Sequence, residues 1–593
     1  MSTDPSIDTE STTEGQDASL ETSNYEVIRK RLVEQGRALA KKADTLNARR
    51  QEFFGSTVMD VIDNQTITTE NNCIPQDIIN LGDQLLFGYN VHRKMSQTQV
   101  SDVFSLHNFS KQGDEIILQH VAQDTSSNFL GQESFIEAFN QLYFSFKDAF
   151  LRQLRRVDGR LLAIFQTGSS LRDIRVFRWA VDVNNNVEYI DNAGQKDNTY
   201  IPSHDFEWNP TKREDHITGK HPHISIKNKV FVETVGGDLT IKLEDNTSDG
   251  EGIYSEPVED KNQALGDASI FWAEVGNLIL LKIKPYREEN WRYFVFNTLT
   301  RTVARVDSIG LSCVALPEDH GIIFPGGYVL ESGEVKTFDN DTAKMRIEHV
   351  QKSPNGEDVL YSFYRPDDGL YFLLSYNLIR KEVQNPIQCH GYSIFDDGTM
   401  IVFRATDDQQ TRHHPMRMWS TPYVSDAFAA AAPTDGSFLS KIGNADLVRG
   451  ISDAYSVRKT INNQSPTVEL YASIISAAER MLDQYYWYGD NEVEDMSSTL
   501  REVIKTCQLV IDEFEKVRAM QQQARKALKE AEDEQKRLFG DIRYGNWREI
   551  SRFVDALDGL RGQRGRLITL REIKYMDIKR VDALEQDVIA QYD

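Results

Sequence analysis

Four histidines fall within one short span of the sequence, HDFEWNPTKREDHITGKHPHISI, at positions 204–226. They are His204, His216, His221 and His223. A zinc or iron site needs three or four ligands held together, and side chains two residues apart on a strand share one face. His221 and His223 meet that spacing, which leaves a metal-dependent enzyme as one hypothesis. Histidines more often satisfy hydrogen bonds at strand ends, so we expect a structural role, with no bound metal and no other cofactor.

Other patterns that could carry chemistry fail on spacing. The sequence has no G-x-x-x-x-G-K-[ST] loop to hold a triphosphate and no G-x-S-x-G nucleophile turn. GLRGQRG at 559–565 is spaced by glycines but lies inside a basic helical pattern. The acidic stretch 245–260 lacks the ligand order of a calcium loop, and His413–His414 has no acidic or sulfur neighbour at ligand spacing. We therefore predict that this chain is not an enzyme.

Composition predicts a reduced, aqueous environment. The chain has 593 residues, a net charge of −24, and four cysteines that lie far apart and form no C-x-x-C pair. No apolar run approaches the ~18 residues that a membrane helix needs. The acidity disfavours general adhesion to nucleic acid or to anionic lipid. We expect several domains, a cytoplasmic protein, and no membrane span.

The N-terminal part changes character near residue 25. Residues 1–24 carry acidic but no basic side chains among many Ser and Thr, a composition typical of disorder. Residues 25–55 are basic, and their apolar side chains recur at helical spacing. We predict a basic amphipathic helix there. A partner helix is its expected neighbour, and direct contact with nucleic acid is the alternative.

Between residues 66 and 425 the apolar period is two. Short alternating runs are separated by turn sequences such as Asn184-Asn185-Asn186, Asp368-Gly369 and Asp397-Gly398. The units recur at about the length of a four-stranded propeller blade, without WD or kelch signatures. The sequence predicts an irregular β-propeller-like all-β domain of six or seven blades. Two packed β-domains are the alternative.

Helical patterns return after the β-rich region. Residues 436–495 predict a helical region, and residues 496–593 predict a coiled-coil-like helical hairpin whose seam Gln521 and Gln535 weaken. The fold class is thus multidomain β + α. The glycines of 559–565 lower helix propensity, so we expect a bend there that would bring the neighbouring arginines to the hairpin tip.

Basic residues cluster near that expected bend. The core of the cluster, within residues 541–580, is Arg561, Arg564, Arg566 and Arg571. Charge runs are usually solvated faces, here paired with the acidic faces of the preceding helix. The other hypotheses are contact with an acidic protein partner and contact with nucleic-acid phosphates.

Several long strings resemble one bacterial family. These strings are TENNCIPQDIINLGDQLLFGYNV, SHDFEWNPTKREDHITGKHPHISI, VFVETVGGDLTIKLEDNT, PEDHGIIFPGGYVL and YNLIRKEVQNPIQCHGYSIFDDGTMIVFRA. They resemble the N-terminal region of the proteins labelled "DNA repair ATPase", over about residues 65–580. The resemblance implies a long N-terminal region followed by an AAA-type ATPase core, and this chain lacks that core's phosphate-binding loop.

From these observations we expect a non-catalytic interaction and regulatory region, associated with an AAA-type ATPase linked to DNA repair or stress response. The expected partner is the ATPase module, in cis in longer relatives or in trans here. The alternative is a nucleic-acid-associated factor that uses the basic helical segments 25–55 and 541–580, with DNA as a possible but not favoured partner.

Overall fold

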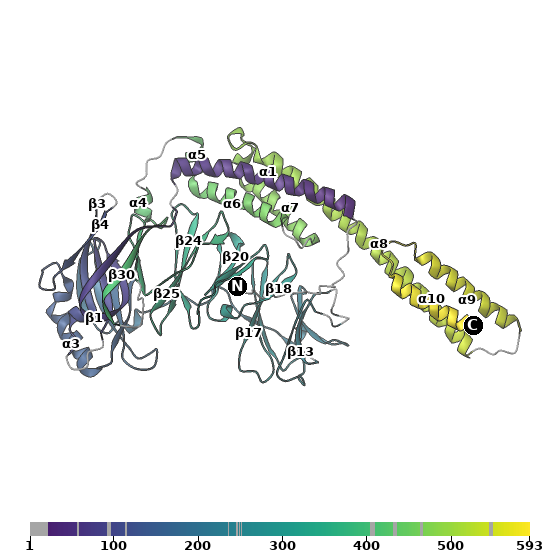
Figure 1. Ribbon diagram of the computed structural model, residues 1–593, viewed down its shortest axis with the longest axis horizontal. Coiled ribbons are helices and arrows are strands. Elements are labelled where there is room, and N and C mark those ends of the chain that lie inside the picture. The colour runs from purple at the N-terminus through teal and green to yellow at the C-terminus, as the bar shows by residue number, and fades with distance from the viewer. Residues whose placement is uncertain are drawn as a thin grey trace, which may run out of the picture. The chain divides into compact units, whose positions relative to one another are not determined.

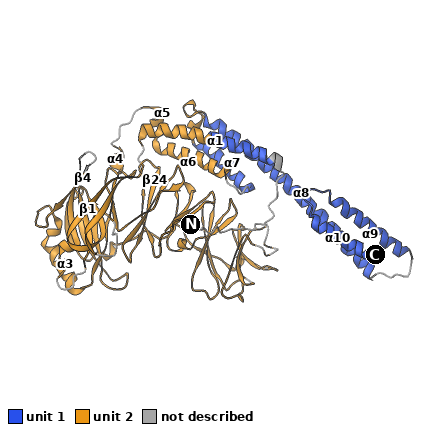
Figure 2. Cartoon of the chain, viewed as in Figure 1, with its two compact units in different colours: residues 1–38, 466–484, 495–593 blue, residues 39–465, 485–494 orange. Residues whose placement is uncertain are grey.

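The computed structural model describes residues 22–55, 58–91, 97–112, 115–234, 236–244, 247, 250, 252–403, 410–430, 436–462, 467–544 and 550–592. Most of the acidic segment 1–24 lies outside these residues. The chain divides into two compact units (Figure 2). Unit 1 comprises residues 1–38, 466–484 and 495–593, and unit 2 comprises residues 39–465 and 485–494. The division falls inside the first helix rather than at a linker.

Unit 2 consists mainly of antiparallel sheets (Figure 1). The largest has the order β28 (Gly391–Ile394), β29 (Thr399–Phe403), β30 (Thr411–Ser420), β1 (Asp60–Leu81), β2 (Gln84–Asn90), β3 (Phe104–Gln112) and β4 (Glu115–Val121). The next is β5 (Phe150–Val157), β6 (Arg160–Gln166), β7 (Ile174–Val181) and β8 (Val187–Asp191). A third is β10 (His216–Ile217), β11 (His223–Ile226), β12 (Val230–Glu233), β13 (Asp238–Lys242) and β14 (Tyr254–Pro257).

Three further sheets complete this region as described. One has the order β18 (Thr302–Arg305), β17 (Arg292–Asn297), β16 (Leu278–Lys284), β15 (Ser269–Val275) and β9 (Asn209–Pro210). The next is β19 (Val314–Ala315), β20 (Gly321–Phe324), β21 (Gly327–Leu330) and β22 (Val335–Thr337). The last joins β23 (Arg346–Lys352), β24 (Asp358–Arg365), β25 (Leu370–Asn377), β26 (Glu382–Val383) and β27 (Ile387–Cys389).

The long strand β1 joins two four-stranded groups. Residues 60–68 and Cys73 pair with β30, whereas residues 74–81 pair with β2. The register shifts between Thr68 and Cys73, a bulge that lets the strand leave one group and enter the next. The earliest strand of the region is thereby paired with its last strand, β30. This arrangement of blade-sized antiparallel groups confirms the propeller-like fold class.

Buried apolar clusters join the groups face to face. Each cluster lies between two successive groups of one series. The series is β5–β8, β1–β4, β28–β30, β23–β27, β19–β22, β15–β18 and β10–β14. Strands such as β16, LILLKIK, are buried on both faces, which explains their nearly continuous apolar sequence. The hydrophobic core of unit 2 is therefore a series of layers between sheets.

Turn residues predicted from the sequence adopt the required backbone. Asn185 has φ 60° at the tip between β7 and β8, and Gly398 has φ 81° between β28 and β29. A Cβ at Gly398 would lie 2.5 Å from the carbonyl oxygen of Thr421, so glycine is required there by conformation and by space.

One segment, residues 197–210, links groups that are distant in this series. The hydroxyl of Tyr200 donates to Gln153 Oε1 on β5 at 3.0 Å, and the Arg346 guanidinium of β23 stacks 3.8 Å from the Tyr200 ring centroid. The Cys313 amide then donates to the Ser203 carbonyl at 2.8 Å, and β9 pairs with β15. The segment thus connects the β5–β8 sheet with the β15–β18 sheet through a path that touches β23.

Unit 2 also contains helices. They are α2 (Val100–Val103), α3 (Glu133–Ser145), α4 (Asp426–Ala430), α5 (Phe438–Ile442) and α6 (Asn444–Ile461), together with the second half of α1 (Thr22–Phe54). Aromatic residues Phe135 and Phe139 bury α3 against the β5–β8 sheet. The Ser452 hydroxyl of α6 donates to the Leu378 carbonyl at 2.8 Å and fixes α6 beside the turn that follows β25.

A buried ion pair holds the second half of α1 in place. Arg50 is fully buried, and its Nη2 donates to Glu357 Oε2 at 2.6 Å. Its other nitrogens donate to Asn47 and to Asn444 of α6. Asn377 donates to both Glu357 and Asp358. One guanidinium therefore ties α1 and α6 to the turn before β24.

Unit 1 contains the first half of α1, α7 (Val468–Gln484), α8 (Met496–Tyr544), α9 (Ile550–Leu570) and α10 (Ile578–Tyr592). The rings of Tyr25, Tyr471 and Phe514 contact one another, and the two tyrosine hydroxyls lie 3.1 Å apart. The side of α8 that packs here is fully buried at Leu500, Val503, Cys507 and Val510. These contacts form the first of two packed regions along α8.

The second packed region is a three-helix arrangement of α8, α9 and α10. Its core contains Ala524, Ala531, Leu560, Leu567, Leu570, Val581, Leu584 and Val588. Gln535 Nε2 donates to the Leu584 carbonyl at 3.0 Å, and Gln563 Nε2 donates to the Ala531 carbonyl at 2.7 Å. Because both amides are buried and bond specific carbonyls, this glutamine layer fixes the register of the three helices.

Between the two packed regions, α8 has a short stretch that buries nothing. Val517 and Ala524 are buried, but no residue from 518 to 523 is. Gln521 lies in this stretch rather than in a packed seam. We call residues 518–523 the α8 junction. The helix continues through it without interruption.

Candidate functional sites

The histidines of 204–226 lie in separate places. His204 belongs to the segment 197–210, where its Nε2 donates to the Ile309 carbonyl at 2.8 Å. Its ring meets Phe206 and Trp208 edge-on, with centroids 5.2 and 5.9 Å away. Burial lowers the pKa of His204, so the ring is neutral at pH 7 and already engaged.

The other three histidines belong to the β10–β11 hairpin. His223 Nδ1 donates to the His221 carbonyl at 2.9 Å. His216 pairs across the hairpin with Ile224, the residue that follows His223. His221 Nδ1 lies 3.9 Å from Glu233 Oε1, while Glu233 forms an ion pair with the fully buried Lys242. In the described residues, no three His, Cys, Asp or Glu side chains are placed to hold one metal ion.

Sequence reasoning missed a cysteine–histidine contact. His414 Nε2 lies 3.2 Å from Cys73 Sγ and 3.2 Å from Thr69 Oγ1. A thiol beside an imidazole is the arrangement of a cysteine nucleophile and its base. The two residues are 341 positions apart and meet because β1 pairs with β30 across the bulge at 69–72. No local spacing could have revealed this pair.

The electrostatics of this pair oppose nucleophilic chemistry. Burial raises the pKa of the Cys73 thiol to about 11 and lowers the pKa of His414 to about 4. At neutral pH the pair is therefore an uncharged thiol and an uncharged imidazole, not a thiolate and an imidazolium. Both side chains are buried. The contact acts as a cross-link between the earliest and the last strand of the sheet region.

A second buried cluster lies where the strands of three sheets meet. Asp77 Oδ2 accepts hydrogen bonds from the Leu154 amide at 2.7 Å and from the Tyr371 hydroxyl at 3.3 Å. Gln153 donates to Tyr371 at 2.8 Å and to Glu348 at 3.1 Å. Burial raises the pKa of Asp77 well above its usual value. The carboxyl is only 2 % exposed, so it ties β1, β5 and β25 together rather than meeting a substrate.

The basic residues predicted for the hairpin tip lie along the three-helix region. Arg561 donates to the Tyr592 hydroxyl at 2.9 Å, and its neighbours pair with carboxylates: Arg564 with Glu585 at 3.1 Å, Arg566 with Glu530 at 3.2 Å, and Arg571 with Asp582 and Glu585 at 2.5 and 2.6 Å. Their side chains are nonetheless 38–68 % exposed. The arrangement can balance charge within the bundle and still meet a partner.

The predicted bend at the glycines is wrong. GLRGQRG lies wholly within α9, which runs uninterrupted from Ile550 to Leu570. A Cβ at Gly562 or Gly565 would meet nothing within 4 Å, whereas at Gly559 it would lie 2.9 Å from Leu538 Cδ2. Gly562 and Gly565 therefore face open space, and the packing of the helix outweighs their low propensity. The backbone amides of this stretch serve the helix and cannot wrap a phosphate.

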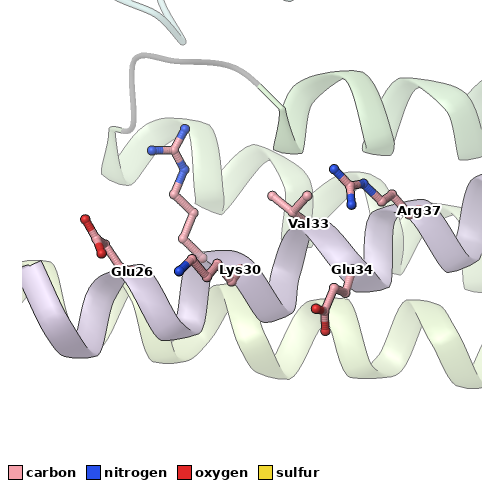
Figure 3. Close-up of a pocket in the computed structure, with 6 residues that line it drawn as sticks. Glu26, Lys30, Val33, Glu34 and Arg37 are labelled. Atoms are coloured by element: carbon pink, nitrogen blue, oxygen red, sulfur yellow. The ribbon is translucent and has the colours of Figure 1, made fainter.

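A shallow groove of about 450 Å³ runs along the first half of α1 (Figure 3). It is lined by Glu26, Arg29, Lys30, Val33, Glu34 and Arg37. Three basic and two acidic side chains surround a single apolar side chain. This mixture suits contact with another polar helix better than enclosure of a small molecule.

A comparison with known protein families shows which family the chain belongs to. The family described as "ATPase involved in DNA repair" matches residues 38–486. The chain belongs to this family. The match spans the sheet region and the helices up to α7, and it ends before α8. No curated protein matches the chain.

Solved structures that match the chain do so at low sequence identity and low TM-score. The Dos1 propeller is 10 % identical, with 61 % of this chain and 95 % of that chain covered and a TM-score of 0.18. The core factor of S. cerevisiae is 10 % identical, with 76 % of this chain and 82 % of that chain covered and a TM-score of 0.22. The β-propeller domain of the Trilobed protease from Pyrococcus furiosus is 10 % identical, with 61 % of this chain and 99 % of that chain covered and a TM-score of 0.19.

Hydropathy along the helices gives one further finding for this family member. Within the ranges that the structure describes, no helix is long and apolar enough to cross a membrane.

Proposed function

We propose that this chain is a non-catalytic interaction and regulatory region that works with an AAA-type ATPase module. The module would act in cis or in trans, and the family resemblance implies an ATPase core of this type in longer relatives. In this proposal the sheet region recognises or holds a partner. The helices of unit 1 transmit that binding to the motor, or the motor's state to the partner.

The observation that carries the proposal is the construction of α8. This helix of 49 residues is about 74 Å long at 1.5 Å per residue. Its first part packs with α1 and α7, and its last part packs with α9 and α10. A single helix rooted in two separate packed regions can carry a displacement from one to the other. The glutamine layer keeps the distal region in one register, as a lever requires.

The absence of a phosphate loop supports a non-catalytic role. The chain has no Walker-type sequence, and the glycine-spaced stretch that comes nearest is helical. The Cys73–His414 contact is buried and uncharged. These features favour regulation of another protein's ATPase over turnover by this chain.

Nucleic-acid binding is the second candidate, because the arginines of α9 remain partly exposed. Their existing carboxylate partners argue against it: phosphates would have to displace Glu585 from Arg564 and Glu530 from Arg566. Each phosphate contact made with duplex DNA would steepen the log–log salt dependence of binding by about 0.9.

Two measurements test the proposal. The first is ATP turnover by the purified chain, which we expect to be absent. Turnover that a point substitution within this chain abolishes would overturn the non-catalytic role. The second is binding of the immobilised chain to the purified ATPase module of a longer family member, which we expect to be saturable. Absence of binding, together with salt-dependent DNA binding that R561A/R564A/R566A abolishes, would favour the nucleic-acid candidate.

A further inference from the structure

A cavity of about 460 Å³ opens beside the loop between β6 and β7. Its walls are Phe146, Thr167, Gly168, Arg172, Asp173, Ile174 and Arg175. Cavities of this size hold small molecules. It lies in the sheet region and contains none of the residues discussed above, so its role is separate from the helical lever.

Two arginines of this cavity have no ion-pair partner in the described part of the chain. Arg172 and Arg175 are exposed, and neither lies within ion-pair distance of a carboxylate. The Arg175 guanidinium instead lies 6.0 Å from the Phe146 ring centroid. Two cations in one cavity wall, against the single carboxylate of Asp173, leave a local excess of positive charge in a protein of net charge −24.

The carboxylate of the cavity is held by the loop itself. Asp173 Oδ2 accepts a hydrogen bond from the Ser170 amide at 3.0 Å. A Cβ at Gly168 would lie 2.6 Å from the same oxygen, so the glycine permits this close approach. Asp173 therefore shapes the loop and leaves the arginine donors uncommitted.

A third arginine lies buried behind the loop. Arg152 is 3 % exposed, and its Nη1 donates to Gln166 Oε1 and to the Leu171 carbonyl, each at 3.3 Å. Its Nε has no hydrogen-bond partner, and no ion pair to a carboxylate is formed within the described ranges. A buried guanidinium without a counter-charge is costly, so the loop carries a positive field from behind as well as from its rim.

We propose that this cavity binds the phosphate group of a small molecule. Guanidinium forks match phosphate oxygens two at a time, and a phosphate monoester near pH 7 brings almost two negative charges to the two cations of the rim. Phe146 offers an apolar wall on which the remainder of the ligand can lie. The buried Arg152 adds attraction without contact. Asp173 weakens binding, because it is the one carboxylate in the cavity wall.

Isothermal titration calorimetry of the full chain at 150 mM salt tests this site. The probes are inorganic phosphate, adenosine 5′-monophosphate and adenosine. We expect saturable one-to-one binding of a probe that bears phosphate and none of adenosine. Tighter binding of the monophosphate than of inorganic phosphate would identify an esterified ligand that uses Phe146. Equal binding would show that recognition is confined to the phosphate group and does not use Phe146.

Three variants separate the site from general charge effects. R172A/R175A should weaken phosphate binding by about 10-fold or more, as loss of charge-assisted hydrogen bonds does. D173N should strengthen it several-fold, an effect that no purely structural role produces. R156A removes an exposed arginine of β5 outside the cavity and should leave affinity unchanged. No binding at millimolar phosphate, equal losses in R156A and R172A/R175A, or weaker binding in D173N would overturn the proposal.

Discussion

The sheet region and the distal helices differ in the charged groups that they bury. Unit 2 buries Arg50 with Glu357, Lys242 with Glu233, and the carboxyl of Asp77. The three-helix region of α8, α9 and α10 leaves the arginines of its carboxylate pairs partly exposed, and the polar side chains that it buries, among its described residues, are Gln535 and Gln563.

This difference follows from what each region must specify. Seven blade-sized groups joined by similar apolar layers could slide or pair in several ways. Buried charges favour one arrangement, because a wrong one would leave an ion unpaired in the core. Three helices have fewer alternatives, and one polar layer suffices to set their register. Substitution should therefore be severe in the first region and mild in the second.

Arg50→Ala should give the largest effect. It leaves Glu357 buried without its partner, which typically lowers the free energy of unfolding by about 3–5 kcal/mol. Denaturant unfolding measures this loss. Arg49→Ala is the matched control, because the neighbouring Arg49–Glu492 pair is about half exposed and should contribute at most about 1 kcal/mol. Equal losses in the two variants would remove the contrast between buried and exposed pairs.

Asp358→Asn should change the pH dependence of stability. Burial raises the pKa of Asp358 to about 7 in the folded chain, from 3.8 as the reference for the unfolded one. The folded state therefore holds a proton that the unfolded state has lost, and the wild type loses stability as pH rises from about 4 to about 7. The slope is roughly 1.4 kcal/mol per pH unit. The variant lacks this contribution.

Unfolding midpoints of wild type and D358N between pH 4 and pH 9 check this expectation. The difference between them should shift in favour of the variant up to about pH 7 and stay constant above it. A difference that is independent of pH would show that Asp358 ionises normally in the folded state.

Gly562→Ala and Gly565→Ala should each stabilise the distal helices by up to about 1 kcal/mol. Both glycines lie within α9, and an added Cβ meets nothing. Thermal unfolding followed by helical circular dichroism measures the gain. Gly559→Ala is the control, because its Cβ would press on Leu538 and should gain less. Destabilisation by all three substitutions would indicate that α9 bends at these glycines after all.

The triple variant R561A/R564A/R566A should have the smallest effect on stability. Its three arginines are partly exposed and screened by salt, and Glu585 keeps Arg571 as a partner in the variant, so we expect a loss of at most about 1 kcal/mol in total. Denaturant unfolding at 0.15 M and 0.5 M salt should give nearly the same value. A loss comparable to that of Arg50→Ala would show that surface pairs, rather than the glutamine layer, hold the three helices together.

The sequence predicted the elements that depend on local patterns. Period-two runs lie in strands, the basic stretch from residue 25 lies in α1, and the apolar spacing after Leu500 lies in α8. Turn glycines such as Gly398 adopt the positive φ that their sequence context requires. These features depend on a few neighbouring residues, which is why one sequence suffices to find them.

Contacts between residues far apart in the chain could not be predicted from the sequence. The contact of Cys73 with His414 depends on the pairing of the first strand with the last, and Arg50 meets Glu357 across 307 positions. The bend was predicted from glycine propensity alone, and the burial of Leu560 and Leu567 on either side of Gly562 outweighs that propensity. The histidine span looked like one cluster, yet the β-hairpin separates His204 from His221 and His223.

The most direct test of the lever uses the α8 junction. Gln522→Pro places a helix breaker where α8 is exposed and buries nothing, so both packed regions should remain folded. The measurement is the ATPase rate of the AAA-type module with saturating wild type, Q522P or the control Q522A. We predict that wild type and Q522A change the rate equally, and that Q522P binds the module but no longer changes it. A rate that responds to Q522P as it does to wild type would contradict the account.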